Sequence, residues 1–418
     1  MTTKVICVAS AKGGSGKTVF TSALGHLLAA LNRRTLVIDT DAATNGLSLF
    51  YLNEVITQRE KVESQAEDEG KSARLSAAGI FELAQGKGQL RTVALGPKLD
   101  LLPATFRFLN TESVSADSFL VSLEETLDLA EESYDFVLLD AQAGSDSIAA
   151  ISMRPEISDQ VVLVSEYDPL SAAGAERLKS LFPEALTYER TWMLINKMLP
   201  EFAPSLGEFL HIAKYLSPIP WNAEVVRAYA QRSLALDLKH GNDYTLAITQ
   251  AARGLLGPDM EADIDKWIDA RAAAVREPIN RQIHDLETEA EGIILERRKL
   301  RRQGQQVRIG GFGAAVLFAL LGVVAALGTS QTGPLMIGLA LAFLVGFVAN
   351  YWRIIAELMA VIVGIEVDID LEVTEGQLRR REQNIDQRLR SLQALAETDP
   401  EELLRSGKRP PASHTEYL

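Results

Sequence analysis

Apolar residues form short, separate blocks in the first half of the chain and two long blocks in the second half. The short blocks carry no charge and are rich in aliphatic residues, a pattern that predicts buried strands. They cover residues 5–9, 36–38, 136–139 and 192–195. A helical segment at 19–31 follows the first block. Strands that alternate with helices predict an α/β fold in which helices flank a mostly parallel sheet.

The two long apolar blocks are residues 309–328 and 334–352, and neither contains a charged residue. A helix needs roughly 20 apolar residues to cross a hydrocarbon layer of about 30 Å. The segment between the blocks, 329–333, is short and polar, so the chain can reverse direction there. We therefore expect a two-helix transmembrane hairpin at 309–352. The alternative is a hairpin inside a soluble core, and the lack of polar residues on every face argues against it.

Positive charge lies at one end of this hairpin. A basic cluster precedes it and one arginine follows it: Arg297, Arg298, Lys299, Arg301, Arg302, Arg308 and Arg353. The connecting turn has no positive charge. By the positive-inside rule, we expect a multi-pass protein of the bacterial inner (cytoplasmic) membrane with both termini cytoplasmic. Tyr351 and Trp352 suit the membrane interface.

Apolar residues on both sides of the hairpin recur every three or four positions, as in a heptad pattern. The chain reverses through the hairpin, so the two segments predict an antiparallel pair of coiled-coil arms. Pro278 is expected to start the first arm or to separate it from a linker helix. Two amphipathic helices packed on the N-terminal domain are the alternative. The heptad residues are Ile279, Ile283, Leu286, Ala290, Ile293 and Leu300, followed by Leu371, Leu378, Ile385, Leu389, Leu392 and Ala396.

These patterns divide the 418 residues into five parts. Residues 58–74 are polar and poor in large apolar residues, which predicts a mobile surface loop or, alternatively, a solvated helix face. The expected parts are an α/β domain at 1–255, a linker helix and first arm at 256–308, the hairpin at 309–352, a second arm at 353–397 and a disordered tail at 398–418.

Composition excludes some classes of function. The formal net charge is −14, and the clustered basic residues lie near the hairpin. A non-specific nucleic-acid binder usually carries a basic face, so we expect no nucleic-acid partner. Cys7 is the single cysteine, which rules out a disulfide within the chain and fits a reducing cytoplasm. The first apolar block is too short for a signal peptide.

Residues 11–18 (AKGGSGKT) join the first predicted strand to the first predicted helix. Glycines there let successive backbone N–H groups face a polyphosphate at the positive end of the helix. Lys17 can reach the β- and γ-phosphates, and the Thr18 hydroxyl can bind Mg²⁺. The loop therefore predicts a site for ATP and Mg²⁺. Its nucleotide-binding residues are expected to be Gly13, Gly14, Ser15, Gly16, Lys17, Thr18 and Val19.

Ala11 replaces the first glycine of the general P-loop pattern, and a second lysine, Lys12, follows it. With this lysine, the loop resembles the deviant Walker A motif of the ParA/MinD family of P-loop ATPases. The resemblance implies that Lys12 reaches across a dimer interface to the partner's nucleotide. It therefore implies a catalytic role for Lys12 beside Lys17.

Two further segments resemble the catalytic strands of that family. LVIDTD at 36–41 looks like its second strand, which implies that Asp41 polarises the attacking water and that Asp39 supports the Mg²⁺ region. FVLLD at 136–140 looks like a Walker B strand, which implies that Asp140 holds a magnesium-bound water. Gly144 completes a switch that senses the γ-phosphate through its N–H. The implied metal residues are Thr18, Asp39 and Asp140.

Two later segments resemble the part of the family that binds the base. WMLINK at 192–197 ends in an Asn–Lys pair, and the resemblance implies that Asn196 reads the adenine edge. IPWN at 219–222 is a similar stretch, which adds Pro220 to the nucleotide-binding residues. The resemblance covers roughly residues 1–255.

The chain departs from the family at two catalytic positions. Ala42 stands where proline usually follows the catalytic aspartate, and the switch reads Ala-Gln-Ala at 141–143 in place of Thr-Pro-Pro/Ala. These departures concern the rate of hydrolysis, not nucleotide binding.

We therefore expect a membrane-anchored, ParA/MinD-like ATPase. ATP-dependent dimerisation and slow hydrolysis would organise or recruit an envelope-associated protein partner. One alternative is a bacterial tyrosine kinase, a class that places its hairpin before the P-loop domain and ends in a tyrosine cluster; here the hairpin follows, and only Tyr417 lies in the tail. A second alternative is a membrane scaffold that uses ATP structurally.

Overall fold

The structure is a computed structural model that describes residues 3–68, 77–108, 113–199, 201–202, 213–329, 333–363 and 375–405. The described chain divides into two units. The N-terminal unit comprises the residues up to 275 together with 399–405, and the helical unit comprises 276–398. The N-terminal unit is therefore built from two separate stretches of chain.

An eight-stranded sheet forms the centre of the N-terminal unit, in the order β10-β9-β8-β1-β7-β2-β6-β5. Only β5 is antiparallel to its neighbour, which confirms the predicted mostly parallel α/β fold. A separate pair joins β3 (Ala77–Ala78) to β4 (Gln89–Leu90). The sheet strands are β1 (Lys4–Ala9), β2 (Thr35–Thr40), β5 (Val93–Gly96), β6 (Leu99–Leu102), β7 (Phe136–Ala141), β8 (Gln160–Ser165), β9 (Thr191–Ile195) and β10 (Lys214–Tyr215).

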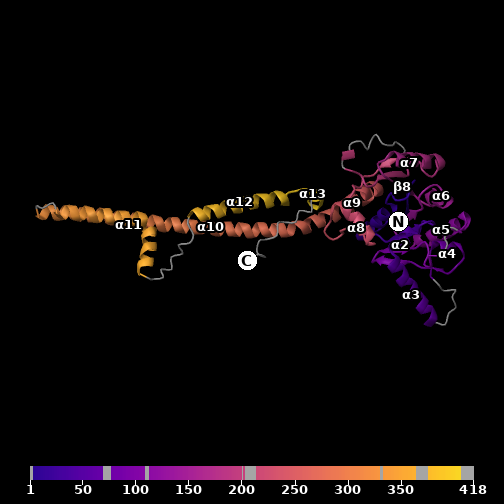
Figure 1. Ribbon diagram of the computed structural model, residues 1–418, viewed down its shortest axis with the longest axis horizontal. Helices are drawn as coiled ribbons and strands as arrows, with labels where there is room; N and C mark the ends of the chain where they lie inside the picture. Colours follow the sequence, from indigo (N-terminus) through magenta and orange to yellow (C-terminus); the bar gives the residue numbers. More distant parts are fainter. Residues whose placement is uncertain are drawn as a thin grey trace. The chain divides into compact units, whose positions relative to one another are not determined.

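Most of the sheet strands are followed by a helix along the chain, although β5 leads directly into β6. Figure 1 labels most of these helices. Residues 58–68 belong to helix α3, so the expectation of a mobile loop at 58–74 is wrong for this part, and residues 69–74 lie outside the described residues. The helices are α1 (Lys17–Ala30), α2 (Gly46–Phe50), α3 (Leu52–Asp68), α4 (Ile80–Ala84), α5 (Ala116–Glu131), α6 (Ser147–Met153), α7 (Pro169–Leu181), α8 (Ala223–Ala230) and α9 (Asp243–Leu256).

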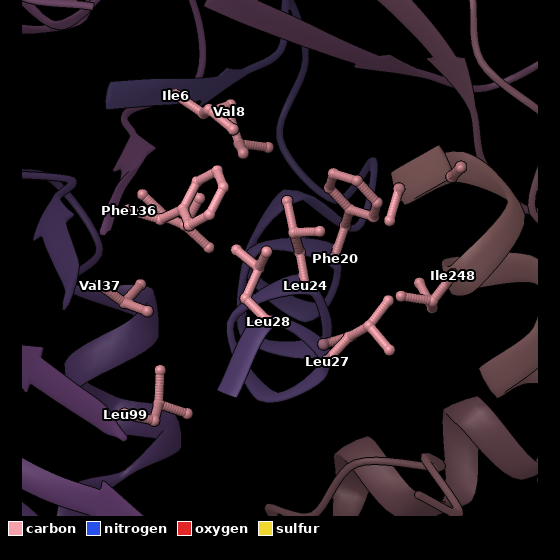
Figure 2. Packing of buried hydrophobic residues seen from close by; sticks show 14 of the residues in the cluster. Ile6, Val8, Phe20, Leu24, Leu27, Leu28, Val37, Leu99, Phe136 and Ile248 are labelled. Atoms are coloured by element: carbon pink, nitrogen blue, oxygen red, sulfur yellow. The ribbon is translucent and has the colours of Figure 1, made fainter. Parts of the chain in front are cut away.

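Two apolar clusters cover the two faces of the sheet. Alternate residues of β1 enter different clusters: Ile6 and Val8 one, and Cys7 and Ala9 the other. This division follows from the period of two in a strand. Figure 2 shows the first cluster, in which side chains of α1 lie between the strands and Ile248 of α9.

Three adjacent parallel strands place the catalytic candidates at one edge of the sheet. Val8 at the end of β1 and Asp39 at the end of β2 both pair in register with Asp140 of β7. The chain leaves β1 at this edge and enters the loop that precedes α1. Ligands of open α/β sheets bind at the carboxyl ends of the strands, so this edge is the first place to look for a site.

Three long helices follow the α/β region: α10 (Pro258–Thr329), α11 (Gly333–Val363) and α12 (Glu375–Ala396). Pro278 lies inside α10. The prediction that a helix starts or breaks at this proline is therefore wrong. Within α11, Tyr351 has non-helical backbone angles (φ −113°, ψ 22°), which produces a kink at the end of the second apolar block.

The apolar parts of α10 and α11 pack against each other through glycines. A Cβ on Gly322 would lie 2.8 Å from the Cα of Gly338, and a Cβ on Gly311 would lie 2.0 Å from the Cβ of Ala349. The two contacts run in opposite directions along the helices, so the helices form an antiparallel hairpin. Both are long and apolar enough to cross a membrane, judged by length and composition.

The predicted arms also pack antiparallel. Ile293 of α10 is buried with Leu378 and Ile385 of α12. Arg297 pairs with Glu382, and Arg276 donates to the carbonyl of Thr398 at 2.6 Å. Leu371 of the second heptad series lies outside the described residues.

A short helix follows α12, within the region where the sequence predicts a disordered tail. Pro400–Arg405 forms α13, which buries Leu403 and Leu404 in the N-terminal unit. The prediction of disorder is wrong for these residues, because Leu403 and Leu404 pack against apolar residues of the N-terminal unit. Residues 406–418 lie outside the described part of the chain.

Candidate nucleotide site

The glycine-rich loop between β1 and α1 has the backbone that a phosphate cradle requires. Gly14 and Gly16 have φ values of +82° and +95°, in the left-handed region that favours glycine. A Cβ on Gly16 would lie 2.1 Å from the Nδ2 of Asn196, so the approach of that amide also excludes a side chain. The loop ends at Lys17, the first residue of α1, whose N–H groups face the loop.

The residues after β9 hold the loop from one side. Asn196 donates from Nδ2 to the carbonyl of Ser15 at 2.8 Å, and Lys197 donates from Nζ to the carbonyl of Gly14 at 2.7 Å. The predicted Asn–Lys pair is thus next to the P-loop. In this structure the Asn196 amide braces the loop backbone.

Glu166, which follows β8, binds both lysines beside the loop. One carboxylate oxygen accepts from the Lys197 Nζ at 2.5 Å, and the other lies 3.7 Å from the Lys12 Nζ. The Lys12 side chain is 53% exposed, whereas Lys17 is buried. The two lysines of the motif therefore occupy different environments, with Lys12 on the outer side of the loop.

Two threonines of α1 bind the carboxylate at the end of β7. Thr18 donates to one oxygen of Asp140 at 2.7 Å, and Thr21 donates to the other at 3.1 Å. Asp140 is buried, and burial raises its pKa to about 6, against the opposing effect of the Lys17 charge and the two hydroxyls. A divalent cation beside Asp140 would favour its ionised form.

Asp39, at the end of β2, faces helix α2. Its carboxylate accepts hydrogen bonds from the Ser48 N–H and hydroxyl at 2.8 and 2.6 Å and from the Asp41 N–H at 3.1 Å. Burial, followed by the charge of Asp140, raises its pKa to about 7. Both of its oxygens have protein partners, so Asp39 holds α2 beside the predicted metal residues.

Asp41 organises the turn that follows β2. Its carboxylate accepts from the N–H groups of Ala43 and Thr44 and from the Thr44 hydroxyl, at 3.1, 2.9 and 2.7 Å. The Ala43 N–H also donates to the side chain of Gln142, which belongs to the predicted switch. Asp41 is 6% exposed, so access to a reacting water requires movement of this turn.

Gly144 lies beside the P-loop, as the switch assignment requires. Its φ is +105°, and its N–H donates to the carbonyl of Ser10 at 2.9 Å. The N–H that the sequence assigns to a γ-phosphate is therefore hydrogen-bonded to the loop in this structure.

Pro220 lies next to Met198, two residues after Asn196. Met198 donates to the carbonyl of Ile219 at 3.0 Å, and Trp221 donates to the carbonyl of Met198 at 2.9 Å. The loop around Pro220 is thereby joined to the Asn–Lys segment. A cavity of about 380 Å³ adjoins this loop.

Comparisons with known proteins agree with this geometry. Residues 3–191 match a family model described as an AAA domain. A putative septum site-determining protein MinD of Guillardia theta is 29% identical over 47% of this chain, and the match spans 65% of that protein's length. A putative MinD of Emiliania huxleyi is 25% identical over 68% of this chain and 96% of its own length. The sporulation initiation inhibitor Soj of Bacillus subtilis is 27% identical over 47% of this chain and 71% of its own. These relatives match mainly the N-terminal unit, which is therefore similar in sequence to MinD and Soj proteins.

Solved structures that are similar to this chain include two complexes with nucleotides. MinD of Pyrococcus horikoshii, complexed with Mg-ADP, has a TM-score of 0.48 at 17% identity, over 62% of this chain and 98% of its own. A putative plasmid partition protein of Borrelia burgdorferi, bound to AMPPNP, has a TM-score of 0.48 at 17% identity, over 61% and 98%.

The donor set of this site fits nucleotide-bound Mg²⁺. The described residues contain no group of three or more His, Cys, Asp or Glu side chains that could hold a metal on their own. Mg²⁺ in nucleotide sites usually takes only one or two protein oxygens and completes its shell with phosphates and water. The Thr18 hydroxyl and the Asp140 carboxylate supply such oxygens at one point.

Sequence reasoning missed several residues that shape the site. Glu166 belongs to no recognisable sequence motif. It contacts Lys12 only because β8 pairs with β1 in the folded chain. Thr21 could have been found, since it lies three positions after Thr18 on the same helix face. Thr44 and Ser48 bind the two predicted aspartates of β2.

Proposed function

We propose that this protein is a membrane-anchored ParA/MinD-type ATPase. ATP-dependent dimerisation and slow hydrolysis would control the recruitment of an envelope-associated protein partner at the bacterial inner membrane. One observation carries the proposal: the Asp140 carboxylate, at the end of β7, is bound by the first turn of the P-loop helix through Thr18. This arrangement joins a phosphate cradle to a magnesium ligand.

Different groups of the site would bind different parts of the nucleotide. Backbone N–H groups of residues 13–17 would hold the phosphates, and the Lys17 ammonium would neutralise their charge. Thr18 and Asp140 would hold Mg²⁺, and the bound ion would neutralise negative charge on the phosphates. Asn196 and Pro220 lie on the side where the base would sit, beyond the loop that Asn196 braces.

The position of Asp41 supports the proposal of slow hydrolysis. This carboxylate is the candidate for orienting the attacking water, yet it is buried and binds Thr44 and two backbone N–H groups. It can meet a water only if the turn after β2 opens. Ala42 gives that turn no proline to fix its backbone.

Dimerisation would bring Lys12 to a second nucleotide. The Lys12 side chain is half exposed and makes only a long ion pair with Glu166, so it can leave Glu166 and move to the nucleotide of a second protomer. Apolar side chains are also exposed on α2 and around α8, with Phe50 stacked on Tyr229 between these helices. The exposed residues are Leu49, Trp221, Val226 and Tyr229.

Membrane attachment would be permanent. Large apolar side chains of the hairpin are exposed, for example Leu327 at 78% and Phe343 at 77%. Water would make such exposure costly at roughly 25 cal/mol per Å², whereas lipid would not. A two-helix anchor inserts effectively irreversibly, unlike an amphipathic helix, so ATP would control assembly within the membrane plane.

The deciding experiment measures the mass of the full-length protein in detergent without nucleotide, with ADP and with ATP, together with phosphate release. We expect a step in subunit number with ATP and slow turnover. Asp41→Ala should reduce turnover at least 100-fold and keep the ATP-dependent step. Lys12→Ala should weaken dimerisation more than ATP affinity.

The second candidate is a scaffold that uses ATP structurally. The hydrogen bonds that hold Asp41 and Gly144 in place favour it, because they leave both groups engaged. A fixed oligomer with bound ATP and no turnover would support this candidate. Equal turnover in wild type and Asp41→Ala would contradict the role of Asp41.

A further inference from the structure

Helix α13 is separated in sequence from the rest of the N-terminal unit, but it belongs to the core of that unit. Leu403 and Leu404 are 1% and 3% exposed, and Leu404 joins the same apolar cluster as the residues of α1. Gly241, at φ +84°, lies against it, and a Cβ there would approach the Leu404 Cδ2 to 3.1 Å. The unit thus has a binding place that fits α13 closely.

Polar contacts fix the register of α13 on α9. Glu401 accepts from the Gln250 side chain at 2.9 Å and from the Arg253 guanidinium at 3.1 Å. Both partners lie on the face of α9 beside the buried leucines. These bonds are charge-assisted and partly shielded, so they define one docked position.

Docking brings Arg405 to the cavity beside Pro220. Arg405 lines this space of about 380 Å³ together with residues of α9 and of the loop that carries Pro220. The other lining residues are Met198, Ser217, Pro218, Pro220, Asp243, Leu246, Ala247 and Gln250. Without α13, the cavity would lose one wall.

Two sets of contacts link the surroundings of α13 to the P-loop. In the first, Met198 is hydrogen-bonded to the Pro220 loop, and Asn196, two residues earlier, donates to Ser15. In the second, α9 packs in one cluster with α1, which begins at Lys17 (Figure 2). A change at either the loop or α1 therefore reaches the surface on which α13 docks.

We propose that α13 is a positioning element of the nucleotide site, whose docking on α9 and the binding of ATP strengthen each other. The proposal rests on the proposed function, because it needs ATP at the P-loop. It assigns Arg405 to the wall beside the base.

Thermodynamic linkage gives the proposal a quantitative form. If ATP strengthens docking of α13 by some factor, docking strengthens ATP binding by the same factor. Coupling of this kind typically amounts to about 5- to 150-fold. A variant that cannot dock should therefore bind ATP more weakly, although the change lies outside the P-loop.

The first test uses full-length protein in detergent and compares Leu404→Asp with Glu402→Lys. Leu404→Asp puts a charge into the buried contact, whereas Glu402 is exposed on the same helix and serves as the control. We expect the Kd for MgATP to rise about 10-fold in Leu404→Asp and to stay unchanged in Glu402→Lys. In wild type, MgATP should slow hydrogen exchange of the 399–405 amides.

Arg405 provides a test that a loss of folding cannot imitate. Arg405→Ala should raise the KM for ATP several-fold and leave kcat unchanged, and Arg405→Lys should restore most of the affinity. Equal ATP affinity in wild type and Leu404→Asp, with the same exchange of α13 in the presence and absence of ATP, would overturn the proposal. Absence of ATP binding in wild type would instead overturn the proposed function.

Discussion

The same residue types occupy opposite environments in the two units. Phe20 and Phe81 of the N-terminal unit are at most 1% exposed, whereas Phe312 and Phe343 of the hairpin are 72% and 77% exposed. Burial of a phenylalanine stabilises a protein by roughly 1.5–3 kcal/mol in water. The many exposed apolar side chains of the hairpin would therefore be costly in water, which supports the proposed membrane anchor.

Polar groups show the reverse contrast. In the N-terminal unit, the buried carboxylates of Asp39 and Asp140 have hydroxyl or N–H partners on both oxygens. The hairpin sequence 309–352 contains no charged residue. The sheet edge of the N-terminal unit can bury charge because it supplies hydrogen-bond donors, whereas the hairpin contains no charged residue that would need them.

The largest expected effect comes from charging the hairpin. Leu320→Arg combined with Phe343→Arg should cost about 3 kcal/mol per residue in membrane insertion, so most of the protein should leave the membrane fraction. Flotation of vesicles measures this. The control is Leu129→Arg on α5, where the wild-type leucine is 66% exposed. Retention of the double variant in membranes would contradict a transmembrane hairpin.

The next effect concerns the arms of the helical unit. Leu378 is 1% exposed, and Leu378→Ala should destabilise the paired arms by about 3 kcal/mol through lost burial and a cavity. Hydrogen exchange of α12 amides in the full-length protein measures the loss. Arg390→Ala, at an exposed position of α12, is the control. Equal exchange in both variants would show that the arms do not depend on their contact.

A pH experiment tests the buried carboxylate of the other unit. The pKa of Asp140 is raised to about 6, so the folded state keeps a proton that the unfolded state releases near pH 4. Stability should therefore fall as the pH rises from 4 through 6. Asp140→Asn should reduce this fall, leaving the part due to the raised pKa of Asp39, and be more stable than wild type at pH 7.5 by up to about 3 kcal/mol.

Denaturant unfolding at pH 4, 6 and 7.5 without Mg²⁺ provides the measurement. The same variant should lose the stabilisation that MgATP gives the wild type. A wild-type stability that rises between pH 4 and 6 would contradict the assigned direction.

The smallest effect should come from an exposed ion pair of α10. Arg281 and Glu277 lie 2.6 Å apart, but their side chains are 75% and 61% exposed. Arg281→Ala should change the stability of the helical unit by no more than about 0.5 kcal/mol. Glu382→Gln, which removes the partner of the three-quarters-buried Arg297, should cost more. Hydrogen exchange of α10 compares the two variants.

The sequence was sufficient for four of the sheet strands and for the P-loop, because each has a local pattern, and the family resemblance already put Thr18 and Asp140 in the same metal site. It was insufficient for Glu166, whose meeting with Lys12 depends on which strands become neighbours. Helix α3 was missed because its composition is polar, although Val55 and Val62, seven positions apart, both pack on the core. The contact between Leu404 and Gly241 has no local sequence pattern either, because the two residues lie far apart along the chain.

The division of the N-terminal unit into two stretches has a consequence for the order of synthesis. A ribosome releases residues 3–275 first, then the hairpin, and only afterwards α13, which fills its place on α9. Roughly 120 residues separate the two stretches, a delay on the order of ten seconds at 5–20 residues per second. The N-terminal unit is therefore completed only after the apolar hairpin has emerged.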